Sequence, residues 1–115
     1  MMVEMYGIPN CDTIRKARRW LDDHDIAFVF HDYKKEGVDV VRLSDWVDQL
    51  GWEVLLNKRG TTWRKLPEAD KQDIDRDRAI ALMCENPSII KRPVLMVGDV
   101  IEVGFSEQRY AGLFA

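Results

Sequence analysis

The sequence predicts an α/β fold in which the two ends of the chain share one mixed, four-stranded sheet and a helical insertion separates them. Three observations lead to this fold class. The first 33 residues read as strand, helix and strand, the middle of the chain has helical periodicity, and two short apolar runs followed by a last helix close the chain. We expect one domain over residues 1–115, with the insertion at about 38–88.

Composition limits the possible functions. Hydrophobic residues make up 46% of the 115 residues and charged residues 32%, which is typical of a globular protein. The net charge of -3 gives no support for direct contact with nucleic acid. The chain starts without a charged-then-apolar leader and has no apolar run that would span a bilayer, so we expect a cytoplasmic protein that does not bind membranes. No exposed apolar seam indicates an obligate dimer, so we expect a monomer.

The first strand is predicted around Val3 to Tyr6, and Gly7 and Pro9 end it. A helix is predicted over residues 11–24. Its inward residues recur at the spacing i, i+3, i+7; they are Ile14, Ala17 and Leu21. The apolar run 26–30 predicts a second strand, which makes a strand–helix–strand unit with a parallel pair.

The middle of the chain is predicted to be helical after a polar connector at 34–37. A helix that includes residues 43–50 ends at Gly51, and residues 52–56 form a further helical turn or two. Residues 57–60 are predicted to form a loop. The segment 61–66 fits either helix or extended chain.

Two more helices are predicted before the chain returns to the sheet. One starts at Pro67, and the other starts near Asp75 and ends by Asn86, because the residue before a proline disfavours helix. The inward residues of the second helix are expected to be Ala79, Leu82 and Met83.

The C-terminal part is predicted to be a hairpin followed by a helix. Strands over 94–97 and 100–103 are joined by the turn signal Gly98-Asp99. Ser106 is a candidate N-cap for the last helix. The residues of that helix expected to face inward are Tyr110, Leu113 and Phe114.

Cys11 lies where the first strand gives way to the first helix. Unpaired N–H groups and the helix dipole at that position favour a negative charge, and thiolates there can have a pKa of about 3.5–7.5. The alternative is a buried, inert cysteine.

For Cys84 we favour that alternative, as a small apolar residue on a helix. His24 and His31 stand at unsuitable spacing to join the cysteines in a zinc site, so no metal is predicted.

The chain resembles a known family in four motifs that occur in order along its length. They are Tyr6 to Cys11 with Arg15, Leu55-Leu56 to Arg59, Arg92-Pro93-Val94, and Val103-Gly104-Phe105-Ser106-Glu107. Together they resemble the thioredoxin fold of the thioredoxin/glutaredoxin superfamily. More narrowly, they resemble the arsenate reductase (ArsC) family and its small Spx/YffB-like members, which have a helical insertion at this place.

The resemblance implies a redox-active Cys11 as nucleophile, a thiolate-stabilising Arg92 and a cis Pro93 beside it. A cis Pro93 would leave nearby backbone groups free to pair with an extended peptide such as glutathione. Ile14 stands where a C-x-x-C motif would have its second cysteine, so a mixed disulfide on Cys11 has no adjacent resolving cysteine and we expect an outside thiol to release it. Cys84, in the predicted insertion, is the less favoured alternative. We therefore predict a glutathione-dependent monothiol reductase with no bound cofactor and with glutathione as cosubstrate. Its other partners would be an oxidised or glutathionylated thiol substrate and glutaredoxin.

The remaining candidate residues would help to bind glutathione or substrate. Gly104 and Ser106 resemble the turn that receives a glutathione carboxylate in glutaredoxins. Asn10 and Thr13 are candidate hydrogen-bond donors to the Cys11 sulfur, and Arg15 lies one turn after it. Arg59 either reaches the pocket or is a solvated loop residue.

Two other functions stay open. The first is glutaredoxin-coupled arsenate reduction, for which family members use three arginines. Only Arg92 matches directly here, since Asn57 and Gly104 take the other two positions, and Arg59 is a candidate displaced substitute. The second is an Spx-like transcription regulator that binds RNA polymerase, although such regulators often carry a C-x-x-C switch, which is absent here.

Overall fold

A computed structural model describes residues 2–115, which divide into two compact units. The first unit joins the described part of Met1–Glu36 to Arg92–Ala115, and the second is Gly37–Lys91. The second unit thus covers the region of the predicted insertion at 38–88. The assignment of the whole chain to a single domain stays a prediction.

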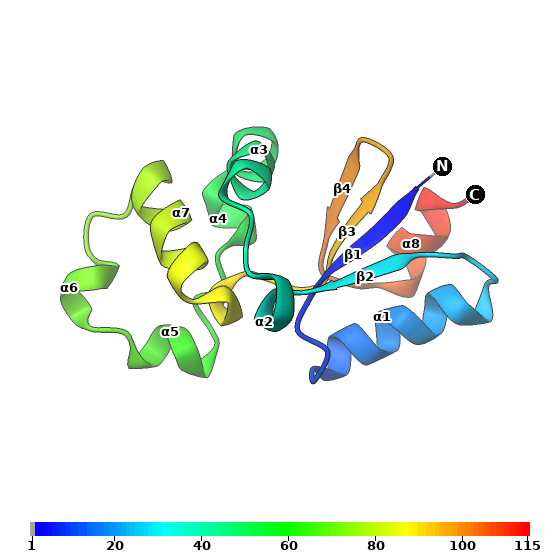
Figure 1. Ribbon diagram of the computed structural model, residues 1–115, viewed down its shortest axis with the longest axis horizontal. Helices are drawn as coiled ribbons and strands as arrows, with labels where there is room; N and C mark the ends of the chain where they lie inside the picture. The colour runs from blue at the N-terminus through cyan, green and yellow to red at the C-terminus, as the bar shows by residue number, and fades with distance from the viewer. Residues whose placement is uncertain (1) are drawn as a thin grey trace. The chain divides into compact units, whose positions relative to one another are not determined.

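The first unit is built on a four-stranded mixed sheet, as predicted, with strand order β2-β1-β3-β4 (Figure 1). β1 (Val3–Gly7) pairs in parallel with β2 (Val29–Asp32) and antiparallel with β3 (Val94–Val97). β4 (Val100–Val103) pairs antiparallel with β3. The N-terminal and C-terminal parts of the chain therefore meet where β1 pairs with β3.

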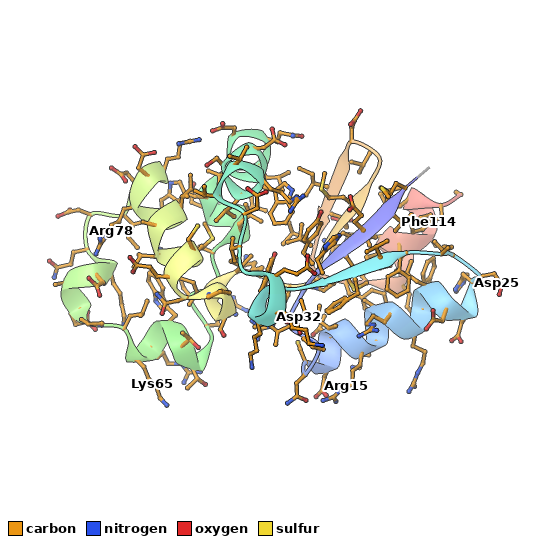
Figure 2. The ribbon with its side chains drawn as sticks, viewed as in Figure 1. Arg15, Asp25, Asp32, Lys65, Arg78 and Phe114 are labelled. Atoms are coloured by element: carbon orange, nitrogen blue, oxygen red, sulfur yellow. The ribbon has the colours of Figure 1, made fainter. Side chains whose placement is uncertain are left out.

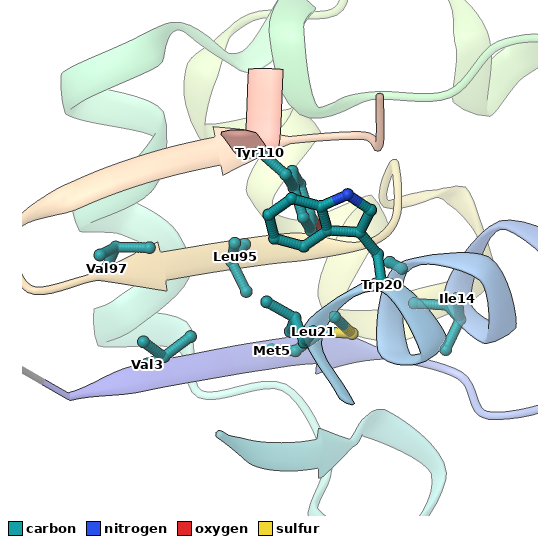
Figure 3. Close-up of a cluster of buried hydrophobic side chains, with 9 residues drawn as sticks. Val3, Met5, Ile14, Trp20, Leu21, Leu95, Val97 and Tyr110 are labelled. Carbon is teal, nitrogen blue, oxygen red and sulfur yellow. The ribbon is translucent and has the colours of Figure 1, made fainter. Parts of the chain in front are cut away.

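The helices α1 (Asp12–Asp23) and α8 (Glu107–Leu113) confirm the predicted first and last helices. Ser106 caps α8, because its Oγ accepts a hydrogen bond from the Arg109 backbone N–H at 3.0 Å. Both helices contribute to one hydrophobic core with alternate residues of β1 and β3 (Figure 3). This core cluster consists of Val3, Met5, Ile14, Ala17, Trp20, Leu21, Leu95, Val97 and Tyr110.

The predicted position of the second strand is wrong by about two to three residues. β2 is Val29–Asp32, not 26–30. Ile26 instead closes the end of α1, where its N–H donates to the Leu21 carbonyl oxygen at 2.9 Å. Ile26 and Phe28 pack against the core cluster from a loop. These two residues are thus apolar because they are partly buried against the core cluster, not because they pair in the sheet.

The second unit contains the predicted helices. α3 (Val40–Leu50) ends at Gly51, whose φ of 90° lies in the left-handed region. α4 (Trp52–Leu55) follows at once, α6 (Glu68–Lys71) begins after Pro67, and α7 (Arg76–Glu85) begins after the N-cap Asp75. The predicted inward residues of α7 are buried; they are Ala79, Leu82 and Met83.

Three short elements go beyond the sequence predictions. The ambiguous segment 61–66 forms the helix α5 (Thr61–Lys65). The expected polar connector begins as the helical turn α2 (Tyr33–Glu36), and a 3-10 turn, η1 (Pro87–Ile89), follows α7. Each is too short to show helical periodicity. Within residues 2–115, no helix is long and apolar enough to cross a membrane.

Candidate active site

Cys11 is the N-cap residue of α1, with an extended backbone (φ -144°, ψ 133°). Its carbonyl oxygen accepts the first helical hydrogen bond, from the Arg15 N–H at 3.0 Å. Its side chain is partly buried and packs against the core cluster. The 12-residue helix therefore presents its unpaired N–H groups next to the sulfur.

These surroundings favour the thiolate. Partial burial alone raises the pKa of Cys11, but four other contributions outweigh it and lower the pKa overall. Hydrogen bonds with the Ile14 backbone, the Arg92 side chain and the Thr13 backbone lower the pKa, as does the positive charge of Arg92. The structure thus brings Cys11, Arg92 and Thr13 together, and Thr13 contributes through its backbone.

Gly7 makes room for this arrangement. A Cβ at Gly7 would lie 2.6 Å from Cδ1 of Ile14 and 3.6 Å from Cβ of Arg92. The absence of a side chain at the end of β1 lets the first turn of α1 and the Arg92 stem pack closely against the strand.

Arg15 and Asn10 contact each other at the start of α1. Arg15 Nη2 donates to Asn10 Oδ1 at 2.8 Å, and Nη1 donates to Asp12 Oδ1 at 2.7 Å. Arg15 therefore links the residues on either side of Cys11, and Figure 2 shows it at the start of α1. Because Asp12 compensates its charge, this geometry favours positioning of the loop over direct binding of substrate.

Pro93 follows Arg92 in the chain, and Gly104 and Ser106 belong to the turn between β4 and α8. The Arg92–Pro93 bond is cis, which confirms the expectation from the resemblance. The Gly104 N–H donates to the Pro93 carbonyl oxygen at 2.8 Å, and the Ser106 hydroxyl accepts the capping bond of α8. Both groups are thus engaged in holding the turn that follows β4.

Arg59 and Cys84 belong to the second unit. The Arg59 N–H donates to Asn57 Oδ1 at 3.0 Å, and its carbonyl oxygen accepts from Arg64 Nη2 at 2.9 Å. A role for Arg59 in binding stays a prediction. Cys84 is partly buried, and burial followed by the charge of Glu85 raises its pKa. Its environment therefore suppresses the thiolate that the environment of Cys11 favours.

Two features of the first unit had no signal in the sequence. His31 lies between two carboxylates, with Nδ1 2.9 Å from Glu36 Oε1 and Nε2 3.0 Å from Glu4 Oε1. Arg109 folds back from α8, and its Nη2 donates to the Val103 carbonyl oxygen at 3.4 Å. The contact between His31 and Glu4 joins residues 27 positions apart, and that of Arg109 depends on the conformation of the turn between β4 and α8. Residue spacing encodes neither. Among residues 2–115, no group of three or more His, Cys, Asp or Glu side chains is placed to hold a metal ion.

Comparison with known proteins agrees with this architecture. The ArsC family model matches residues 6–113. The chain is 45% identical to an uncharacterised protein of Haemophilus influenzae, over 99% of this chain and 100% of that protein. It is similar to the solved structure of a YffB protein, with a TM-score of 0.96, 50% identity and coverage of 99% and 100% of the two chains.

More distant relatives include a regulator of transcription. The global transcriptional regulator Spx of Streptococcus mutans is 28% identical over 92% of this chain and 78% of its own length. The family model covers nearly the whole chain, and the thioredoxin-like sheet, the N-cap cysteine and the cis proline agree with the motifs that first indicated the resemblance. The chain belongs to the ArsC family.

Proposed function

We propose that this ArsC-family protein is a glutathione-dependent monothiol thiol-disulfide reductase with Cys11 as its nucleophile. The observation that carries the proposal is the N-cap position of Cys11, where Arg92 and the backbone of α1 lower the pKa of its thiol. A thiolate is the attacking species in thiol–disulfide exchange, so an environment that lowers the pKa of Cys11 supports that reaction.

The proposed cycle has two exchange steps. The Cys11 thiolate attacks one sulfur of a disulfide substrate, forms a mixed disulfide with it and releases the other sulfur as a thiolate. A glutathione thiolate then attacks the substrate sulfur of the mixed disulfide. The products are a glutathionylated substrate and the Cys11 thiolate. If the substrate was already glutathionylated and Cys11 takes up the glutathione moiety, the second step yields oxidised glutathione.

An external thiol is needed because the chain supplies no neighbouring resolving cysteine. Ile14 occupies the position three residues after Cys11. The other cysteine, Cys84, is in the second unit, where its raised pKa makes it a poor attacking group. Glutathione is a peptide thiol, and we propose Pro93, Gly104 and Ser106 as neighbours of its binding site.

Oxidised glutathione tests the proposal directly. We expect a single adduct of one glutathione on the wild-type protein, mapped to Cys11 by peptide mass spectrometry, and reduced glutathione should remove it. Cys84→Ser is the matched control and should form the adduct at an unchanged rate, whereas Cys11→Ser should not form it. An adduct that forms equally at Cys84, or none at Cys11, would refute the proposal.

Arsenate reduction is a weaker alternative. Asn57 and Gly104 stand at two positions where the resemblance implies arginines. Loss of two charge-assisted hydrogen bonds, at about 1.5–3 kcal/mol each, weakens oxyanion binding strongly. We expect little turnover in an assay with arsenate, glutathione and glutaredoxin. Efficient turnover would favour the alternative.

The similarity to Spx supports a second candidate, a regulator of transcription. In that case the protein would bind RNA polymerase, and the chemistry of Cys11 would not be needed. A pull-down with RNA polymerase separates the two functions. Capture of the polymerase by Cys11→Ser as well as by wild type would favour the regulator. A lack of capture, together with adduct formation at Cys11, would favour the reductase.

A further inference from the structure

Three chain segments of the first unit meet at one end of the sheet. β1 and β4 run parallel to each other because both are antiparallel to β3, which lies between them. Cys11 follows the C-terminal end of β1, Arg92 and Pro93 precede the start of β3, and Gly104 follows the C-terminal end of β4. The hydrogen bond from Gly104 to Pro93 connects the last two segments.

Arg109 brings a cation to the β4 side of this end. Its Nη2 lies 3.4 Å from the Val103 carbonyl oxygen and 3.3 Å from the point that a Cβ at Gly104 would occupy. Its Nε lies 3.6 Å from Glu102 Oε1. The guanidinium thus lies against the backbone of a glycine that has no side chain to shield it.

The guanidinium is held loosely and is open to solvent. Both polar contacts are longer than the usual 2.9–3.0 Å of a protein N–H···O hydrogen bond. The Arg109 side chain is 50% exposed. Within residues 2–115 these contacts engage at most two of its five N–H groups, so the group keeps the forked donor pair that binds a carboxylate in bidentate fashion.

The spacing of the sheet matches the length of a short peptide thiol. β1 and β4 are two strand spacings apart, which is about 9.5 Å. An extended tripeptide spans about 10 Å, at 3.3–3.6 Å per residue. Because the reacting sulfur lies within the peptide and not at its end, only the part of this length between the sulfur and a terminal carboxylate extends from Cys11 toward the β4 side.

We propose that Arg109 binds a terminal carboxylate of the peptide thiol that reacts at Cys11, and so makes the site selective for glutathione over uncharged thiols and disulfides. This inference rests on the proposed reductase function. It assigns to Arg109 a part in binding and none in the activation of Cys11, which depends on Arg92 and the start of α1.

The test compares oxidised glutathione with its carboxyl-esterified form, both at low concentration and low ionic strength. The rate of adduct formation at Cys11 is followed by intact mass in the Cys84→Ser background. We expect that background protein to react about tenfold faster with the acid than with the ester, which corresponds to about 1.4 kcal/mol. Arg109→Ala should abolish this preference, and Arg109→Lys should retain part of it. Arg42→Ala removes a surface arginine of the second unit and should keep the preference.

A substitution of Glu102 also tests whether Arg109 binds the carboxylate of the peptide thiol. Glu102 is the carboxylate that competes for Arg109, so Glu102→Gln should increase the preference for the acid. If Arg109→Ala does not fold, the preference measured for Glu102→Gln tests the role of Arg109 instead. An unchanged preference in both Arg109→Ala and Glu102→Gln would overturn the role of Arg109 and leave the reductase proposal standing. No adduct at Cys11 with either compound would overturn both.

Discussion

Arg92 is the side chain whose removal tests the activation of Cys11 most directly. It contributes both a hydrogen bond and a positive charge that lower the pKa of Cys11. In the Cys84→Ser background, we expect the rate of alkylation by iodoacetamide to reach half its maximum at a lower pH in the folded protein than in the same protein unfolded in urea, because the surroundings of Cys11 lower its pKa. Arg92→Ala should move that midpoint to higher pH, because the hydrogen bond and the charge are both lost.

The control for this titration is Arg42→Ala, which removes a positive charge from α3 in the second unit. Its alkylation midpoint should equal that of the parent protein. If Arg92→Ala and the parent protein had the same midpoint, Arg92 would have no part in thiolate stabilisation. The start of α1 would then remain as the source of the lowered pKa.

Gly7 is the second residue on which the geometry around Cys11 depends. In Gly7→Ala the new methyl group would meet Cδ1 of Ile14 at 2.6 Å, and Ile14 is fully buried. Since Ile14 must turn within a packed core, we expect a loss of about 1–3 kcal/mol in the free energy of unfolding, measured with urea.

Gly112 is the matched control, because a Cβ there meets nothing within 4 Å and the residue lies within α8. Gly112→Ala should stabilise the protein by about 0.5–1 kcal/mol, as alanine loses less backbone entropy than glycine in a helix. Equal effects of the two substitutions would show that the contact between Gly7 and Ile14 is not restrictive.

At the scale of elements, His31 ties β2 to β1 through Glu4 and to α2 through Glu36. Its ring also stacks on Tyr6, with centroids 4.5 Å apart. Partial burial lowers the pKa of His31, but the hydrogen bonds to Glu36 and Glu4 and their charges outweigh it, so the pKa is raised overall. The protonated ring can donate to both carboxylates at once.

A raised pKa in the folded state gives a definite sign to the pH dependence. The contribution of protonated His31 to the free energy of unfolding is complete below the pKa of histidine in the unfolded chain, about 6.5. It is lost as the pH rises through the higher pKa of His31 in the folded protein. We expect the wild type to exceed His31→Gln in unfolding free energy by about 1 kcal/mol at pH 6, with a smaller margin at pH 9. Urea titrations at the two pH values measure this difference, and a margin that grew with pH would contradict it.

The elements also show what the sequence could and could not predict. Helices with several apolar turns or a clear cap, such as those capped by Asp75 and Ser106, were found because the local pattern and the structure agree. The start of β2 was misplaced because Ile26 and Phe28 are partly buried against the core cluster without pairing in the sheet. The one-turn helix α2 was missed because four residues are too few to show a helical period in their apolar positions.

The same distinction applies to the candidate site. Cys11 was predicted from its position between a strand and a helix, and Arg92 from its place before a proline in a motif that resembles the family. The pair Asp12–Arg15 has the i, i+3 spacing of a helical ion pair, whereas the contact of Arg15 with Asn10 depends on side-chain rotamers that the sequence does not predict. Arg109 reaches Gly104 only because β4 and α8 meet in a tight turn, which sequence spacing does not describe.

At the scale of the whole molecule, the order of the strands in the sheet differs from their order in the chain. β3 follows the 55-residue second unit (residues 37–91), yet it lies between β1 and β4 and pairs with both. A chain that ends at Lys91 retains β1 and β2 and lacks Leu95, Val97 and Tyr110 of the core cluster. The sheet of the first unit therefore depends on residues from both ends of the chain.

This dependence predicts the behaviour of a truncated chain. In the fragment 1–91, β1 has lost its antiparallel partner, and a two-stranded sheet is not stable alone in water. We expect the amides of Val3–Gly7 to exchange with deuterium far faster in the fragment than in the intact chain, as read by peptide mass spectrometry. Addition of the peptide 92–115 should restore part of the protection, because it supplies β3, β4 and α8 together. If β1 stayed protected in the fragment alone, its stability would have to come from β2 and α1, and the central position of β3 would matter less than the sheet order implies.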